Sequence, residues 1–468
     1  MKENAKKVFV GIIVLAGIAV VFACAVKLIQ AQRDKAMVQS SEISGVNAPK
    51  ENAITIEAKT NVPTTVTLDD GSKVQITEEN WRNYWDETRV NAVKDTNGVI
   101  VPVPKGYSSS KIYKKVNDEN VYIERTVDTG FVIYEDTADQ SGEPDGEIQY
   151  TYPGTEAQGA VIIWATDASS TVNSLVLKTA QTTRNQYVWV PVYNVDDMYG
   201  VDSTGKKWGK TYNMYNNSEP TLYGSVNNGI YQKDNNYREP DVVTSYDNDK
   251  TLPTYITEEE RNEINKELTS NYEKTIASIK KYGGFYIGRY ETGNLGQGTA
   301  KVVKSNSDIH TKRWYTMYRK CKELKGNNEN VITSMIYGSQ WDRTLMWIME
   351  TGKTYNDIAK DSTSWGNYSM ASFYYFNGTS YSMKSNSRLR LSTGCAEYTN
   401  ANNIYDLSGN VWDWTLEASG TDFRRCRGGS YDDYGYDNPA GDRYGINPSS
   451  SHSYYVGFGC RAALYVDL

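Results

Sequence analysis

The amino-acid sequence predicts an α+β fold with much irregular structure, preceded by a transmembrane helix and a β-rich N-terminal region. Three observations support this prediction. Residues 8–26 form an uncharged apolar run, strand-like alternation of apolar residues recurs up to about residue 192, and residues 256–284 carry a well-capped helical pattern. At 468 residues, the chain has room for two or three domains or for one large mixed domain.

The apolar run from Val8 to Val26 is long enough to span a bilayer as a helix. A short flank precedes it and a large body follows, which favours a signal anchor within residues 1–30 and a single-pass membrane protein with its bulk outside the cytoplasm. Two alternatives remain open. The segment Ala23–Ala25 resembles a cleavage site, and the letters VFAC resemble a lipoprotein box that ends in Cys24.

The next two segments are polar or strand-like. Residues 31–95 are interpreted as a stalk or linker that includes a small hairpin, because apolar residues alternate around Asp70 and Gly71 and a short helix pattern follows. Residues 96–184 form a β-rich lead-in, in which apolar runs are separated by turn residues. The remaining residues, 185–468, form the main predicted domain.

Residues 256–284 give the clearest helix in the main domain, with acids in its first turn, lysines in its last turn and a glycine pair after it. Two further amphipathic helices are predicted from Trp314 and from Ser339. After Ser362 the chain is rich in Tyr, Ser, Asn and Gly, which predicts short strands and long turns.

Composition excludes several classes of function. The formal net charge is -7 and the basic residues are scattered among acids, which argues against nucleic acid as the partner. The chain contains only two histidines, His310 and His452. Most zinc, non-haem iron and Ser-His-Asp sites need at least one well-placed imidazole, so catalysis of those kinds is nearly excluded.

Five motifs occur along the chain in this order: YVWVPV, GGFYIGRYETG, NNIYDLSGNVWDW, RGGSY and GCRAAL. Their order resembles that of the formylglycine-generating enzyme (sulfatase-modifying factor) family, whose domain is a variant of the C-type lectin fold. The resemblance covers roughly residues 185–466. It implies that the GNVWDW, RCRGGSY and GCRAALYV segments pair in one small antiparallel sheet.

The GNVWDW motif has two interpretations. If it is an ordinary strand, Trp412 and Trp414 point into the core and Asp413 between them is exposed. The family resemblance instead implies a calcium ion before this strand. Its ligands would be the carboxylates of Asp406 and Asp413 and the carbonyl oxygens of Gly409 and Val411, since calcium prefers several oxygen ligands.

The enzymes of the family bind copper through two cysteines that follow the GGSY motif. The matching positions here are Asp433 and Asn438, and neither side chain can replace a thiolate ligand of Cu(I). We therefore expect no copper and no oxidase activity. Cys426 and Cys460 bracket this segment, and we expect them to be structural, as an interior pair or as a disulfide between neighbouring strands.

Residues 431–455 are dominated by Tyr, Asp, Ser, Gly and Asn, a composition typical of antibody paratopes and also of many exposed loops. We expect a ligand-binding loop. The predicted contact residues are Tyr431, Asp432, Asp433, Tyr434, Tyr436, Asp437, Asn438, Asp442, Tyr444, Asn447, Ser450, His452, Tyr454 and Tyr455.

The sequence therefore predicts a surface-displayed, calcium-stabilised binding protein for an extracellular protein or glycan. Residues 431–455 contain no Lys, Glu, Gln, Trp or Met, so the chain also resembles the variable proteins of diversity-generating retroelements. Two alternatives remain: an enzyme with the oxidase chemistry of the family, and a structural component of a pilus or surface shaft.

Overall fold

The computed structural model divides the chain into two units, Met1–Glu51 and Asn52–Leu468. The first unit lies outside the described residues, so every structural statement below concerns the second. The structure describes residues 62–95, 97–109, 111–116, 119–124, 130–136, 146–150, 161–165, 184–215, 218–240, 257–296, 298–310, 314–377, 381–420, 423–446, 448 and 457–468.

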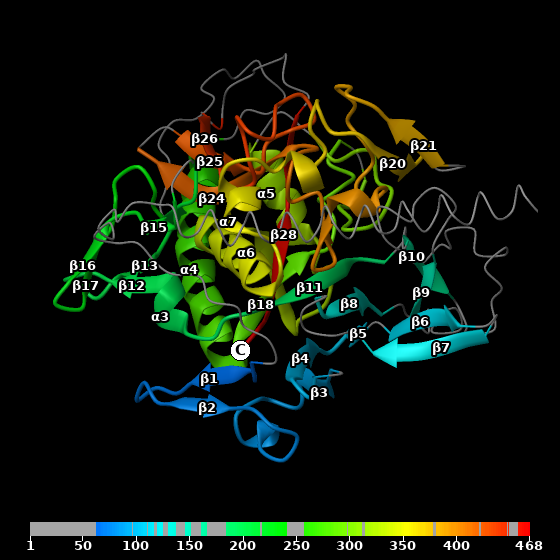
Figure 1. Ribbon diagram of the computed structural model, residues 1–468. Helices are drawn as coiled ribbons and strands as arrows, with labels where there is room; N and C mark the ends of the chain where they lie inside the picture. Colours follow the sequence, from blue (N-terminus) through cyan, green and yellow to red (C-terminus); the bar gives the residue numbers. More distant parts are fainter. Residues whose placement is uncertain are drawn as a thin grey trace, which may run out of the picture. The chain divides into compact units, whose positions relative to one another are not determined.

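A six-stranded sheet forms the centre of this unit (Figure 1). The named strand pairs within it are all antiparallel, and it joins strands from early, middle and final parts of the chain. Its strands, in spatial order, are β19 (Val331–Met335), β28 (Ala462–Val466), β18 (Gly284–Gly288), β11 (Gln186–Pro191), β8 (Val132–Glu135) and β5 (Tyr107–Ser109).

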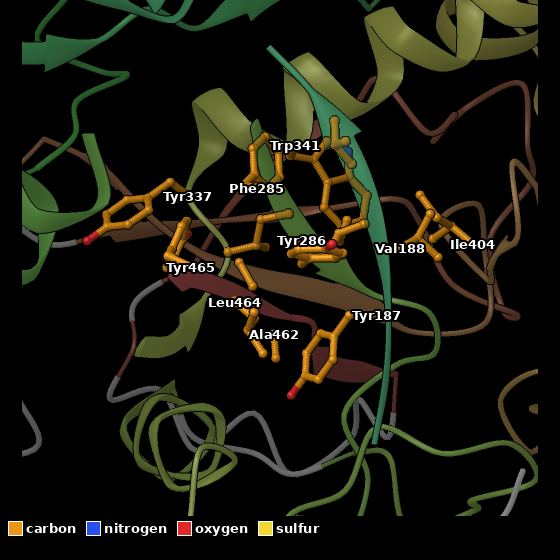
Figure 2. Packing of buried hydrophobic residues seen from close by; sticks show 14 of the residues in the cluster. Tyr187, Val188, Phe285, Tyr286, Tyr337, Trp341, Ile404, Ala462, Leu464 and Tyr465 are labelled. Atoms are coloured by element: carbon orange, nitrogen blue, oxygen red, sulfur yellow. The ribbon is translucent and has the colours of Figure 1, made fainter. Parts of the chain in front are cut away.

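The central strands are buried on both faces, which explains their nearly continuous apolar sequences. Helices pack against β11, β18 and β28. Figure 2 shows aromatic and aliphatic side chains from these strands and from the helix that carries Trp341 meeting in one cluster. Tyr187, Tyr286 and Leu464 in this cluster are almost completely buried. The sheet and its helices therefore share one hydrophobic core.

The predicted long helix is present as α4 (Glu258–Tyr282). Thr257 caps its first turn: the Thr257 hydroxyl accepts a hydrogen bond from the Glu260 amide, and the Glu260 carboxylate accepts one from the Thr257 amide. Gly283 ends the helix with a φ of 80°, in the left-handed region that glycine adopts without strain. Local chemistry thus determines both ends of α4.

The other two predicted helices are also present, as α5 (Trp314–Glu323) and α6 (Gly338–Thr351). Helix α5 buries its aromatic face, including Trp314, whose indole N–H donates to the Thr415 carbonyl. In α6, every residue from Gly338 to Glu350 is buried. Helix α6 therefore lies inside the unit instead of covering its surface.

A second sheet has four strands, three of which (β24, β25 and β26) are labelled near the top of Figure 1. Strand β24 pairs antiparallel with β25 but parallel with β27. The prediction of one small antiparallel sheet is therefore wrong in part, because the observed sheet contains both parallel and antiparallel pairs. In addition, GCRAALYV is divided between β27 of this sheet and β28 of the central sheet. The strands, in order, are β26 (Arg443–Ile446), β25 (Phe423–Arg427), β24 (Trp412–Ser419) and β27 (Phe458–Cys460).

The remaining strands form short pairs and one further four-stranded sheet. The pairs are β1 (Thr65–Thr67) with β2 (Lys73–Gln75), β3 (Val90–Lys94) with β4 (Ile100–Pro104), β12 (Tyr199–Val201) with β13 (Lys207–Gly209), β14 (Tyr212–Asn213) with β15 (Thr221–Leu222), β16 (Ser225–Asn227) with β17 (Ile230–Gln232), β20 (Phe373–Phe376) with β21 (Tyr381–Lys384), and β22 (Asn400–Ala401) with β23 (Ile404–Tyr405). The sheet contains β10 (Val161–Ala165), β9 (Gly146–Tyr150), β6 (Lys111–Val116) and β7 (Glu119–Glu124).

Short helical segments connect several of these strands. The hairpin predicted around Asp70 and Gly71 is confirmed, because β1 and β2 pair across this turn. The short helix predicted after it is a single turn, η1. The short helices are η1 (Trp81–Asn83), α3 (Val195–Met198), α7 (Tyr355–Ala359), η5 (Thr363–Trp365) and η6 (Glu397–Thr399).

The predicted fold class is wrong. The described residues form a mainly stranded structure with few helices, not an α+β, C-type lectin-like domain preceded by a transmembrane helix. The physical reason is that, within the described residues, long helical patterns are limited to α4, α5 and α6, whereas Tyr, Thr and Val between Asn and Gly turns favour short strand pairs.

The predicted placement at a membrane is also corrected. Within the part of the chain that the structure describes, no helix has both the length and the apolar character needed to cross a bilayer. The predicted anchor at residues 8–26 and Cys24 lie outside the described residues.

Candidate functional site

The segment that follows β25 begins with a tight turn at Gly428 and Gly429. Both glycines have positive φ values, 93° and 75°. A Cβ atom on Gly429 would lie 2.4 Å from the Asn438 carbonyl oxygen, so the backbone of the segment folds directly onto this turn. Only glycine combines this φ value with so close an approach. The turn therefore determines where the predicted ligand-binding segment starts.

Two of the predicted contact residues brace the segment from within. The Asp433 Oδ2 atom accepts hydrogen bonds from the Trp412 indole N–H (2.9 Å), the Ser430 amide (2.9 Å) and the Ser430 hydroxyl (2.7 Å). Burial raises the Asp433 pKa, although the bonds from Ser430 oppose this shift. The Asn438 side chain donates to Asp442 Oδ2 at 2.9 Å. These bonds make the segment an ordered part of the fold.

The outward side chains of the segment include three tyrosines. Tyr436 and Tyr444 are each 50% exposed. The half-buried Tyr434 ring stacks on Tyr436, with a centroid distance of 5.3 Å and an interplanar angle of 16°. The Tyr444 ring lies 5.7 Å from that of Trp412. These rings present rigid aromatic surface because the backbone beneath them is braced.

Acidic side chains accompany the exposed rings. Asp432 and Asp437 are exposed, and Asp432 forms an ion pair with Arg388 at 3.2 Å. Desolvation raises the Tyr436 pKa, and the charge of Asp437 adds to this shift. Tyr431 is half-buried. The described part of the segment thus offers phenol groups and carboxylates together.

Five predicted contact residues are not placed by the structure. They lie outside the described residues, so their predicted role is neither supported nor opposed. They are Asn447, Ser450, His452, Tyr454 and Tyr455.

The β20–β21 hairpin beside this segment was missed by the sequence analysis. Tyr374 on β20 pairs with Met383 on β21, and their side chains are 37% and 51% exposed. Met370, just before the hairpin, is also exposed. The Ser369 amide donates to the Asp433 carbonyl at 3.0 Å. This bond connects the base of the hairpin to residues 431–444, the tyrosine segment. Alternation in FYYF was the available signal for an outward Tyr374.

The predicted calcium residues lie in a second, buried cluster. Asp406 Oδ2 accepts hydrogen bonds from the Thr393 hydroxyl (2.9 Å) and the Gly394 amide (2.8 Å). Asp413 Oδ2 accepts one from Arg461 Nε at 3.2 Å, and Asp413 Oδ1 has no hydrogen-bond partner. Burial raises the Asp413 pKa to about 6, although Arg461 lowers it.

Glu291 is a third carboxyl group in this cluster, and the sequence analysis did not assign it a role. Glu291 Oε2 accepts a hydrogen bond from Asn410 Nδ2 at 2.7 Å, and Oε1 accepts one from the Val411 amide at 3.3 Å. Burial, then Asp406 and Asp413, raise the Glu291 pKa well above its usual range. The GGFYIGRYETG motif, which contains Glu291, was the available signal.

The guanidinium group of Arg461 is the charge partner that the sequence analysis missed. In addition to Asp413, Arg461 donates to the carbonyl oxygens of Gly288 (2.9 Å) and Tyr405 (2.8 Å), and it is fully buried. Within the described ranges, no group of three or more His, Cys, Asp or Glu side chains is arranged to hold a metal ion. The carboxylates influence one another electrostatically, but their described contacts are with protein donors.

Of the two interpretations of GNVWDW, the ordinary strand with an exposed Asp413 between two core tryptophans is wrong. Trp412, Asp413 and Trp414 are all buried, because β24 lies between β25 and β27 and both of its faces are covered. The Trp414 ring packs 5.8 Å from that of Phe458. Asp413 is therefore a buried acid that needs a positive partner, and Arg461 provides one.

The structure shows no disulfide between Cys426 and Cys460, which was one of the two predicted alternatives. Cys426 and Cys460 are both buried free thiols, together with Cys321 and Cys395. The sulfur of Cys460 instead lies 3.5 Å from that of Cys321 on α5. Sequence order gave no indication of this contact, because the two residues are separated by 139 positions.

Comparison with models of protein families found no match, and comparison with curated proteins also found no match. The resemblance to the formylglycine-generating enzyme family therefore rests on the sequence motifs alone.

Proposed function

We propose that this protein is a non-catalytic binding protein. Its ligand-binding face would consist of the described tyrosine segment (residues 431–444) and the adjoining β20–β21 hairpin. The observation that carries this proposal is the stack of the half-buried Tyr434 ring on the exposed Tyr436 ring, on a segment braced by Asp433. Tyrosine supplies large contact area at a low cost in side-chain entropy, and aromatic residues dominate binding energy at many interfaces. An extracellular protein or a glycan is the proposed ligand.

The residue types at the family's copper positions support a non-catalytic role. Asp433 and Asn438 occupy these positions, and both make hydrogen bonds that brace the segment. A Cu(I) oxidase site needs soft thiolate ligands. Aspartate and asparagine instead provide hard oxygen and amide groups, which form hydrogen bonds that hold the segment in place.

The test is a comparison of wild-type protein with the Tyr436→Ser, Tyr444→Ser double variant on a glycan array and on an array of extracellular protein domains. Both tyrosines are half-exposed, so each change should alter stability by less than about 0.5 kcal/mol. We expect wild-type signals to disappear in the double variant while the melting temperature stays nearly constant.

The matched control replaces two exposed apolar residues of another hairpin, Val226→Ser with Ile230→Ser, and it should keep the array signals. Equal loss of signal in both double variants would contradict the proposed face. A large fall in melting temperature of the tyrosine variant would show instead that the rings support the fold.

We further propose that calcium binds at Asp406, Gly409, Val411 and Asp413. The oxygen donors of these residues suit a hard cation, and Asp413 Oδ1 has no hydrogen-bond partner. When bound, the ion would neutralise carboxylate charge beside Arg461. The test is thermal melting with and without chelator: we expect a lower melting temperature after chelation, and no such difference in Asp413→Asn. Identical wild-type melts, for a sample shown to contain calcium before chelation, would contradict the proposal.

We also propose a relation to the formylglycine-generating enzyme family and to retroelement-diversified variable proteins. The five ordered motifs and the biased composition of residues 431–455 support it. The neighbouring DNA provides the test. A reverse transcriptase gene and a near copy of the tail sequence, with adenines at the variable positions, are expected beside the gene of a diversified protein.

A further inference from the structure

Two cysteines that are distant in the sequence meet in the core. Helix α5 carries Cys321 and strand β27 carries Cys460, and the two elements pack against each other. Their Sγ atoms are 3.5 Å apart, and neither side chain is exposed. The other two described cysteines lie elsewhere: Cys395 belongs to a small cluster with Phe373, and Cys426 is on β25.

Local contacts hold the two thiols in this position. The Thr292 amide donates to the Cys460 carbonyl at 2.9 Å, and the Thr292 hydroxyl lies 3.8 Å from the Cys321 sulfur. A disulfide needs a sulfur separation of about 2.05 Å. Rotation of the two side chains can shorten the present distance, because both sulfurs already face each other across the α5 and β27 contact.

We propose that Cys321 and Cys460 form a disulfide under oxidising conditions and so join α5 covalently to β27. The oxidant is a small-molecule disulfide such as oxidised glutathione. One cysteine thiolate attacks it, which gives a mixed disulfide and releases one glutathione thiol. The second cysteine then displaces the other glutathione thiol. The protein loses two hydrogens in total, and one glutathione disulfide is reduced to two thiols.

Burial determines when the bond can form. It raises the pKa of the Cys460 thiol well above its usual range, so the thiolate needed for attack is scarce in the folded protein. We therefore expect rapid formation while the chain folds and slow formation in the already folded, reduced protein. Once formed, the bond closes a long loop and restricts the unfolded chain, which raises the melting temperature by about 5 °C or more.

The experiment refolds the full chain in a mixture of oxidised and reduced glutathione, with a parallel sample kept in reductant. Peptides from digestion without reduction are then identified by mass spectrometry. We expect a peptide pair joined through Cys321 and Cys460, two hydrogens lighter than the separate peptides, in the oxidised sample only. The oxidised sample should also melt at the higher temperature.

Cys321→Ser should abolish both the linked peptide and the increase in melting temperature. Cys426→Ser is the matched control, since Cys426 is equally buried on β25 of the same sheet as β27, and it should retain both effects. Free thiols at Cys321 and Cys460 after oxidation, or linkage of either residue to Cys395 or Cys426, would overturn the proposal. The wild-type digest decides between these outcomes even if a variant does not fold.

Discussion

Glu239 is a fully buried carboxyl group at the start of α6. Its oxygens accept hydrogen bonds from the Ser339 amide at 3.1 and 3.2 Å. Burial raises the Glu239 pKa to about 8, and the charges of Glu417 and Asp342 act in the same direction, against the bonds from Ser339. Asp342 and Glu417 both form ion pairs with Arg443, whereas Glu239 forms none within the described part of the chain.

This raised pKa predicts a pH-dependent stability. Between its ordinary pKa, near 4.5, and about 8, the native protein retains a proton that the unfolded chain releases. Stability from this group is therefore greatest below pH 4.5 and falls as the pH rises to 8. Glu239→Gln should remove the dependence, so the melting temperature of the variant relative to wild type should rise from pH 5 to pH 8.

Thermal melts at several pH values measure this difference. Glu263→Gln, which changes an exposed acid on α4, is the control and should give a difference that does not vary in the same way. A Glu239→Gln difference that stays constant from pH 5 to pH 8 would mean that Glu239 is ionised in the native protein.

At the scale of elements, the glycine turn between β25 and the tyrosine segment is the most constrained connection at the proposed binding face. A Cβ on Gly429 would contact the Asn438 carbonyl oxygen and the Tyr368 ring. Gly205, in the turn between β12 and β13, has a similar φ of 84° but open space around it. Substitutions at the two positions therefore distinguish the energetic cost of backbone strain from the cost of steric overlap.

We predict that Gly205→Ala lowers the free energy of unfolding by about 1–2 kcal/mol, the cost of a left-handed alanine. Gly429→Ala should cost roughly 1–3 kcal/mol more, because Asn438 or Tyr368 must also move. Urea denaturation of both variants measures the difference. Equal losses would indicate that the segment adjusts without cost and that the turn does not hold it rigidly.

Elements with local signals could be predicted from the sequence, whereas those defined by distant partners could not. Helix α4 was predicted because the acids of its first turn, the lysines of its last turn and the glycine pair from Gly283 are local signals at its own ends. The parallel pairing of β24 with β27 was missed, because residues 420–457 separate the two strands and any register would fit their short apolar patterns. The same distinction applies to the site. The tyrosine segment could be predicted from its own composition, whereas the contact between Arg461 and Asp413 joins residues 48 positions apart.

At the scale of the described unit, the central sheet crosses the domain boundary predicted at residues 184 and 185. Strand β8, before the boundary, pairs with β11 after it, and Val132 and Ile133 on β8 are completely buried. A fragment containing only residues 185–468 would expose the edge of β11 and part of the core.

We therefore predict that the 185–468 fragment melts at a much lower temperature than the full chain or aggregates on expression. Circular dichroism and size-exclusion chromatography of both proteins provide the measurement. The control adds back residues 62–184 in the same vector and should restore full-chain behaviour. A monomeric fragment with the melting temperature of the full chain would show that β5 and β8 are dispensable.

Helix α6 has no solvent-exposed face, and this determines how its amide hydrogens can exchange with solvent. Its amide hydrogens are covered by the central sheet, by α7 and by β24, so solvent reaches them only when those layers separate. Hydrogen–deuterium exchange in α6 should then proceed through global unfolding and be the slowest in the molecule. The tyrosine segment, in contrast, lies at the outer surface, where hydrogen exchange needs only local opening. Slow exchange in α6 and faster exchange at the surface would show that the centre of the fold stays closed while its outer parts open locally.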